Sequence, residues 1–178
     1  MSEKPPYRFS FENEVKPYRV QPPKSPKDIF LRMVEGTDIS IMLASRDAGY
    51  HTAPHVHDAE QFNYIVEGEL WIFVEEHGYR CVKGDIMRVP RNKIHWAWNR
   101  GTGPCVMLEA HTPPLTGDAM IKFGAVAMMT EEEESEALDG VVNIQVEYPK
   151  LAEVEERAIR EVEEANRKPV KSLAPADG

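Results

Sequence analysis

The stretch GYHTAPHVHDAEQFNYIVEG, from Gly49 to Gly68, decides the fold that this sequence predicts. Alternate residues of a β-strand point to the same side, so His55 and His57 present two imidazoles to one point. Gln61 cannot join them on the same straight strand, because four residues at about 3.3 Å each would carry it roughly 13 Å from His57. We therefore expect the chain to turn at residues 58–60, so that Gln61 opens the next strand and faces the same interior.

A second stretch, GDIMRVPRNKIHWAWN from Gly84 to Asn99, adds a third histidine, His95, after a Pro-Arg-Asn loop. His55, His57 and His95 are half of the six histidines, and they lie in these two stretches, where apolar and polar residues alternate between turn-forming glycine, proline and asparagine residues. Three neutral imidazoles are a common ligand set for Fe, Cu, Ni and Zn, and an amide oxygen adds a hard fourth ligand. Such a set leaves positions for water or substrate. The predicted metal ligands are His55, His57, Gln61 and His95.

Short β-rich runs separated by Gly, Pro, Asn or Asp fill residues 29–114. Regular short strands with turn signals are typical of an all-β sandwich or barrel. A chain of 178 residues with 42% hydrophobic side chains is large enough to bury one core. We expect strands at Ile29–Val34, Asp38–Ala44, Gln61–Val66, Glu69–Glu75, Tyr79–Val82, Asp85–Val89, His95–Asn99 and Cys105–Ala110.

The two ends of the chain differ from this β-rich part. Residues 1–28 are proline-rich and predict an extended arm without a helix, draped over the barrel or over a neighbour. Residues 115–178 form a C-terminal extension, in which 130–140 predicts a short acidic helix and 141–148 a strand. An amphipathic helix is expected after Pro149, with its apolar face made by Leu151, Val154, Ala158, Val162 and Ala165.

Charge and cysteine content narrow the partners that we expect. The chain carries a net charge of −9, of which −8 falls within residues 131–168, so the rest of the chain is nearly neutral. A neutral body with an acidic tail argues against nucleic acid and anionic membrane as partners. No apolar run approaches the roughly 20 residues that cross a bilayer, and we see no signal pattern. With only two cysteines, Cys81 and Cys105, a cytoplasmic protein is expected.

The two stretches resemble the paired motifs of the cupin superfamily, whose members are small jelly-roll β-barrels with a metal in the barrel mouth. The resemblance covers residues 49–99 and implies such a barrel over roughly 29–114. Two positions depart from the family pattern. Asn92 stands where the second motif usually has glycine, and asparagine tolerates a left-handed turn. Gln61 stands where the first motif usually has glutamate. A subset of cupins is known to use glutamine there. Strand parity points the neighbouring Glu60 the other way.

Parity also suggests residues that act beside the metal. On the last strand, either Glu109 and His111 or Leu108 and Ala110 face the interior, and Glu109 or His111 would suit a general base. His51 has the parity of His55 and is a candidate proton carrier, although a surface position fits equally well.

Aromatic side chains at the alternate positions should face outward and need a cover. The cover is either the proline-rich arm or a second subunit, and the resemblance to cupins implies a homodimer. Trp71 and Phe73 cannot be assigned to either face, although they would suit an apolar pocket. The aromatics expected outside are Phe62, Tyr64, Trp96 and Trp98.

Three functions fit the predicted site. The first is a mononuclear enzyme, with iron favoured, that uses O₂ to oxidise or cleave a small organic substrate, as many cupins do. The second is a non-redox isomerase, lyase or decarboxylase, in which the ion acts as a Lewis acid on a sugar acid or a keto or hydroxy acid. Besides the favoured iron, Mn, Ni, Zn or Cu is possible as the metal of the site. The third is a cupin that only binds a small molecule. With Gln61 in place of a carboxylate, a divalent site would keep two positive charges, which favours an anionic substrate.

Overall fold

The computed structural model describes residues 10–15, 17–20, 29–114 and 144–167. These residues form an all-β domain followed by one long helix, α3 (Leu151–Arg167). The strands are β1 (Pro17–Val20), β2 (Ile29–Glu35), β3 (Ser40–Arg46), β4 (His55–Val56), β5 (Glu60–Glu67), β6 (Glu69–Val74), β7 (His77–Val82), β8 (Ile86–Val89), β9 (His95–Trp98), β10 (Cys105–Thr112) and β11 (Ile144–Gln145).

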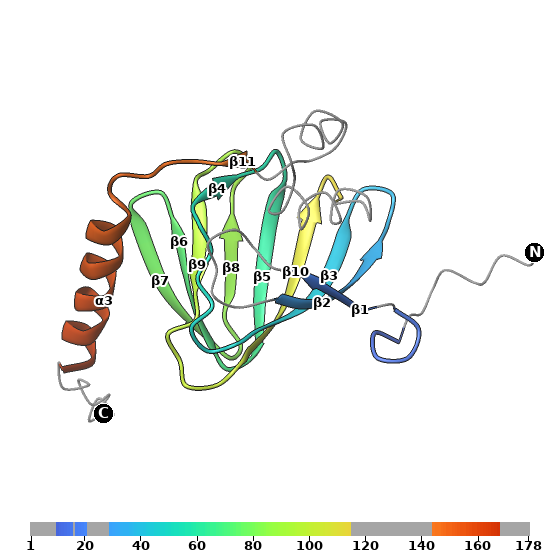
Figure 1. Ribbon diagram of the computed structural model, residues 1–178, viewed down its shortest axis with the longest axis horizontal. Coiled ribbons are helices and arrows are strands. Elements are labelled where there is room, and N and C mark those ends of the chain that lie inside the picture. Colours follow the sequence, from blue (N-terminus) through green and yellow to red (C-terminus); the bar gives the residue numbers. More distant parts are fainter. Residues whose placement is uncertain (1–9, 16, 21–28, 115–143, 168–178) are drawn as a thin grey trace, which may run out of the picture.

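Two antiparallel sheets face each other and make the barrel (Figure 1). The first sheet, which we call the large sheet, has the strand order β1-β2-β3-β10-β5-β8, and the second has the order β11-β4-β9-β6-β7. Strands distant in sequence are therefore neighbours, as in a jelly roll. The connection from β4 to β5 crosses from one sheet to the other and brings both sequence motifs to the same end of the barrel.

Side chains alternate between the interior and the outside, as the pleat of a strand requires. In β3 and β10 every second residue is buried. The buried apolar side chains fill the space between the sheets and hold them together. The core comprises Ile29, Leu31, Met42, Ala44, Tyr50, Ile65, Leu70, Ile72, Cys81, Val89, Cys105 and Met107.

Helix α3 lies beside β7 and covers the outer face of the second sheet (Figure 1). Val154 and Ala158 of the helix pack on Trp71, Phe73 and Trp96 of this sheet. Trp96 therefore points outward as predicted but is 1% exposed, because this chain's own helix covers it. This corrects the expectation that the arm or a second subunit covers Trp96. It also places Trp71 and Phe73 outside the barrel, so they line no pocket within it.

Positive backbone φ angles occur where the motif glycines form turns. The φ angles are 83° at Gly49, 78° at Gly68 and 94° at Gly84, a region that glycine enters without steric cost. At Gly68 a Cβ atom would also lie 2.4 Å from the carbonyl oxygen of Pro104. Asn92, which replaces the usual glycine, has a φ of 60°, as its tolerance of left-handed turns predicted.

The predicted strands between residues 29 and 114 all form, with ends shifted by up to two residues. The shift that matters most for the site is at β3, which continues to Arg46 instead of ending at Ala44. The proline-rich arm contributes β1 to the edge of the large sheet. The acidic helix predicted at 130–140 lies outside the described residues, whereas α3 forms where expected. No helix in the described part of the chain is long and apolar enough to cross a membrane.

Candidate metal centre

Three histidines converge at one end of the barrel. His55 lies on β4, His95 lies directly opposite it on β9, and His57 follows β4 in the loop that leads to β5. One ring nitrogen of each lies within 4.8 Å of the corresponding atoms of the other two. The i, i+2 spacing of the first motif and the strand pairing with the second thus bring together the three histidines that the sequence predicted.

Backbone carbonyl groups fix the orientation of all three rings. Nδ1 of His55 lies 2.9 Å from the carbonyl oxygen of Ala53, and Nδ1 of His95 lies 2.9 Å from that of Lys93. Nδ1 of His57 makes the same contact, 2.9 Å, with Ala59. A carbonyl oxygen only accepts, so Nδ1 carries the proton in each ring and Nε2 is left with a lone pair. These are the second contacts that metal-binding histidines ordinarily make.

Gln61, the second residue of β5, turns its side-chain oxygen toward the histidines. Its Nε2 donates to Asn63 Oδ1 at 2.7 Å and to Glu109 Oε2 at 3.2 Å. These two acceptors assign the amide, so that Oε1 lies 3.0 Å from Nε2 of His57. Glu60 points outward and pairs with Arg88, as strand parity predicted.

The donor set fits a metal ion. The other contacts of His57 and Gln61 make Nε2 of His57 and Oε1 of Gln61 acceptors. These two atoms lie 3.0 Å apart with no proton between them. Nε2 of His95 is buried and has no hydrogen-bond partner among the described residues. Buried acceptors that converge without a donor are costly, and a cation next to all of them would remove that cost. Imidazole nitrogens with an amide oxygen suit a divalent transition metal.

The histidines of the cavity are neutral at physiological pH. Burial lowers the pKa of His55 to about 4 and that of His111 to about 3, because a charged imidazolium loses its hydration. Burial also lowers the pKa of His57, and it lowers that of His95 further, helped there by the neighbouring imidazoles. Neutral rings are the form that binds metals.

Glu109 and His111 of β10 face the interior, so the structure selects this parity over Leu108 and Ala110. Oε1 of Glu109 forms a buried ion pair with Nη2 of Arg46, and its Oε2 accepts from Gln61. Nε2 of His111 lies 3.7 Å from the same Oε2. Two of the three residues that the sequence proposed for catalysis, Glu109 and His111, therefore lie next to the predicted ligand Gln61.

His51, the third residue proposed for catalysis, does not line this cavity. Its Nε2 lies 2.8 Å from Oε1 of Glu155 on α3, and its ring stacks on Trp98. The same Glu155 oxygen accepts from Nε1 of Trp96 at 2.8 Å. His51 thus joins the helix to the outer face of the barrel, and the expectation that it acts as a proton carrier in the site is corrected.

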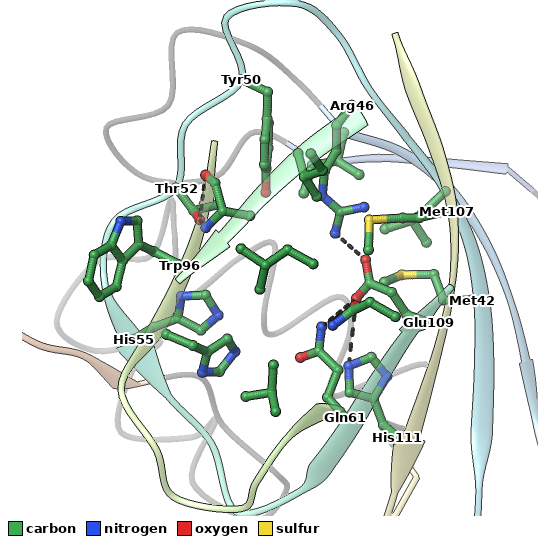
Figure 2. A pocket seen from close by; sticks show the side chains of 18 of the residues that line it. Met42, Arg46, Tyr50, Thr52, His55, Gln61, Trp96, Met107, Glu109 and His111 are labelled. Atoms are coloured by element: carbon green, nitrogen blue, oxygen red, sulfur yellow. Dashed lines mark hydrogen bonds and ion pairs between the residues drawn. The ribbon is translucent and has the colours of Figure 1, made fainter. Parts of the chain in front are cut away.

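The cavity within the barrel has a volume of about 60 Å³. Figure 2 shows His55, Gln61 and His111 at one side of it, and Arg46 and Tyr50 entering from another. Sequence reasoning missed Arg46 and Tyr50. Arg46 has the parity of Met42 and Ala44, so extending the predicted strand by two residues would have placed its charge in the interior. The remaining wall is largely apolar and includes Met42, Leu70, Ile72, Val89 and Met107.

Comparison with known proteins agrees with this architecture. Residues 43–111 match the family model described as "Cupin domain". A search of curated proteins finds no significant match.

Solved structures with the same fold include proteins from three bacteria. The polyketide cyclase RemF from Streptomyces resistomycificus is 18% identical, with a TM-score of 0.52 over 59% of this chain and 78% of that one. An RmlC-like cupin from Shewanella frigidimarina is 21% identical, with a TM-score of 0.51 over 59% and 89%. A predicted oxalate decarboxylase from Thermotoga maritima is 15% identical, with a TM-score of 0.52 over 56% and 94%. At such identities the likeness shows the fold alone.

Proposed function

The chain belongs to the cupin superfamily, and we propose that it is a metal-dependent enzyme that oxidises a small anionic organic molecule with O₂. The observation that carries the proposal is the convergence of unprotonated acceptor atoms from three neutral histidines and Gln61. They would hold one divalent ion, for which we favour iron. A bound ion of this kind would polarise the substrate and, if redox-active, supply electrons to O₂.

The charge of the site supports an anionic substrate. All four proposed ligands are uncharged, so a divalent ion would keep its full charge of +2, whereas a glutamate at position 61 would reduce it to +1. The nearest carboxylate, Glu109, is already paired with Arg46 and does not compensate this charge. In the low-dielectric interior an uncompensated charge attracts an anion more strongly than it would in water.

The side chains around the ligands have separate tasks. Asn63 and Glu109 hold the amide of Gln61 with its oxygen toward the histidines. Apolar residues of the barrel, such as Leu70 and Ile72, exclude water from the cavity. The small volume of the cavity favours a compact substrate.

A second function, a non-redox isomerase, lyase or decarboxylase, is favoured by one specific observation. Glu109 and His111 place a carboxylate and a neutral imidazole in the cavity, beside Gln61. Nδ1 of His111 has no hydrogen-bond partner among the described residues, so it is free to exchange a proton with a substrate. Proton transfer on a keto or hydroxy acid needs such a group, whereas oxygenation does not.

Metal analysis and oxygen consumption of the protein as purified separate these functions. Iron or copper near one ion per chain, with O₂ uptake on addition of small carboxylic acids or phenols, supports the oxygenase. Zinc, manganese or nickel with turnover but no O₂ uptake supports the second function. Metal and anion binding without turnover would indicate a cupin that only binds its ligand. Protein that retains no metal after incubation with each of these ions would overturn the proposed centre.

We also propose that the protein is a homodimer. The outer face of the large sheet exposes apolar side chains of β5 and β8, with Tyr64 44% and Ile86 68% exposed and paired across the two strands. Phe62 and Val66 extend this face. A contiguous apolar surface on a sheet is typical of a protein interface.

A further inference from the structure

Arg46 is buried in the barrel with only part of its hydrogen-bonding capacity used. Its side chain is 8% exposed, and Nη2 is the nitrogen that pairs with Glu109. Nε and Nη1 are buried and have no partner of normal hydrogen-bond geometry among the described residues. A guanidinium carries five N–H donors and cannot lose its charge in a protein. Unpaired buried donors on a cation are costly, so they mark a position where an acceptor is expected.

Glu109 is not that acceptor in this arrangement, because neither of its oxygens makes a hydrogen bond with Nε or Nη1 of Arg46. Oε1 receives Nη2 of Arg46, and Oε2 receives Nε2 of Gln61 at 3.2 Å. An arginine that served only to neutralise a carboxylate would ordinarily bind it through two nitrogens. Apart from the Tyr50 hydroxyl, which interacts with the guanidinium, Nε and Nη1 have no acceptor of ordinary geometry among the described residues and are available to a further group.

The free side of Arg46 belongs to the same cavity as the histidines. Arg46 and Tyr50 both line it, and the Cζ atom of Arg46 lies 5.3 Å from the centre of the Tyr50 ring. Figure 2 shows the guanidinium and the Tyr50 hydroxyl directed into the space that His55 enters from the opposite side. Burial raises the pKa of Tyr50, so its hydroxyl remains a neutral donor. Donors therefore gather at one side of the cavity and metal-ligating acceptors at the other.

We propose that Arg46, assisted by Tyr50, binds the carboxylate of a small oxo- or hydroxy-carboxylic acid, whose second oxygen faces the cluster of His55, His57, His95 and Gln61. The binding of the carboxylate is inferred from Arg46 and does not depend on the metal centre. The orientation of the second oxygen depends on the metal centre of the proposed function. The cavity is small, about 60 Å³, which favours a compact acid.

The test measures binding of pyruvate, with pyruvamide as its uncharged analogue, by calorimetry. Removing Arg46 from the wild type would strand the Glu109 carboxylate, so the matched pair is Glu109→Gln and Arg46→Gln/Glu109→Gln. These two variants differ only in the guanidinium. We expect pyruvate to bind the double variant at least about tenfold more weakly, the typical effect of a charge-assisted contact, and pyruvamide to bind both alike. Equal pyruvate affinities would overturn the proposal, as would the absence of pyruvate, glyoxylate and lactate binding to the wild type.

Zinc titrations distinguish a failure of this inference from a failure of the proposed function. If the wild type binds no zinc but pyruvate binding to metal-free protein still depends on Arg46, the metal centre fails and the arginine site stands. If zinc binds and pyruvate affinity is the same with and without Arg46, the inference fails alone. A crystal structure of the wild type with pyruvate needs no variant to fold: a carboxylate on Arg46 supports the proposal, and a carboxylate elsewhere overturns it.

Discussion

Nε2 of Gln61 donates a hydrogen bond to Oε2 of Glu109 at 3.2 Å, and this contact turns the amide oxygen toward His57. Gln61 therefore stands between the buried carboxylate of Glu109 and His57, so that an uncharged amide faces the three proposed metal-binding histidines. Glu109 is in turn held by Arg46. The arrangement separates the negative charge of the interior from the proposed metal ligands.

Moving that charge onto the ligand set should weaken the binding of anions. In Gln61→Glu, a carboxylate would face the histidines and reduce the charge of a divalent site from +2 to +1. We expect zinc-loaded Gln61→Glu to bind pyruvate about tenfold more weakly than the wild type, because the attraction scales with the charge of the site. Calorimetric titration of pyruvate into the zinc-loaded proteins measures this.

The charge-swap variant Gln61→Glu/Glu109→Gln is the control for this experiment. It keeps the total charge of the interior and changes only the location of the carboxylate, so it should bind pyruvate as weakly as Gln61→Glu. Glu109→Gln alone keeps the neutral ligands and should bind at least as tightly as the wild type. If pyruvate affinity does not change in Gln61→Glu, the charge of the ligand set does not select the substrate.

Removing one histidine should abolish stabilisation by metal. A ligand that binds only the folded state stabilises it by about 2.7 kcal/mol at a hundred times its dissociation constant. We expect zinc to raise the melting temperature of metal-free wild type and to leave that of His95→Ala unchanged. His77→Ala is the matched control, because His77 is exposed on β7 and lies outside the cavity. A zinc-dependent rise in His95→Ala as large as in the wild type would show that the metal binds elsewhere.

The sequence predicted the strands and the positions of the histidines well because both depend on short-range patterns. The pleat has a period of two, so the spacing of His55 and His57 and the burial of Gln61 follow from counting residues. The end of β3 could not be found in this way. Ser-Arg-Asp at residues 45–47 looks like a turn, but the strand continues because Arg46 pairs with Ile29 and Cys105 on the neighbouring strands.

Contacts between distant segments account for what the sequence did not predict. Trp96 points outward as alternation requires, but the side chains that cover it come from α3, more than fifty residues later. The amphipathic pattern predicted the helix and its apolar face, and it carried no information on the sheet against which that face packs. His51 was misplaced for the same reason, since its partner Glu155 lies on the helix.

Acid should destabilise the metal-free protein through its buried histidines. The pKa of His111 is about 3 and that of His55 about 4, below the ordinary value of 6.5, so the unfolded state binds more protons below that value. The stabilising contribution is complete above pH 6.5 and is lost as the pH falls toward 4, by about 1.4 kcal/mol per pH unit for each proton taken up. Urea unfolding from pH 7 to pH 4.5, in a metal chelator, measures the free energy of unfolding.

Carboxylates also contribute to acid unfolding, so the informative quantity is the difference between variants. His111→Gln cannot take up a proton and should lower the slope of unfolding free energy against pH by about one proton between pH 6 and pH 4.5. Identical slopes for His111→Gln and the wild type would contradict a neutral, buried His111.

The exposed face of the large sheet should hold two chains together. We expect light scattering to give about twice the 20.2 kDa of one chain, and Ile86→Lys to shift the mass toward the monomer, because a buried lysine at an interface is costly. Ile39→Lys replaces another exposed isoleucine, 43% exposed and away from β5 and β8, and should leave the mass unchanged. A monomeric wild type at micromolar concentration would rule out this dimer.

The close approach of α3 to β7 should make Gly78 sensitive to a single methyl group. A Cβ atom at Gly78 would lie 2.6 Å from Cβ of Ala158 and 2.6 Å from two ring atoms of Phe73, which is too close for any real contact. We expect Gly78→Ala to lower the free energy of unfolding by about 1–3 kcal/mol, as overpacking usually does. Gly103→Ala is the control, because its added Cβ meets no atom within 4 Å.

Zinc affinity should be the same in both variants, since the helix packs on the outer face of the barrel and the histidines lie within it. Equal stability of the two variants, measured by urea unfolding, would mean that α3 is not packed on the sheet in solution.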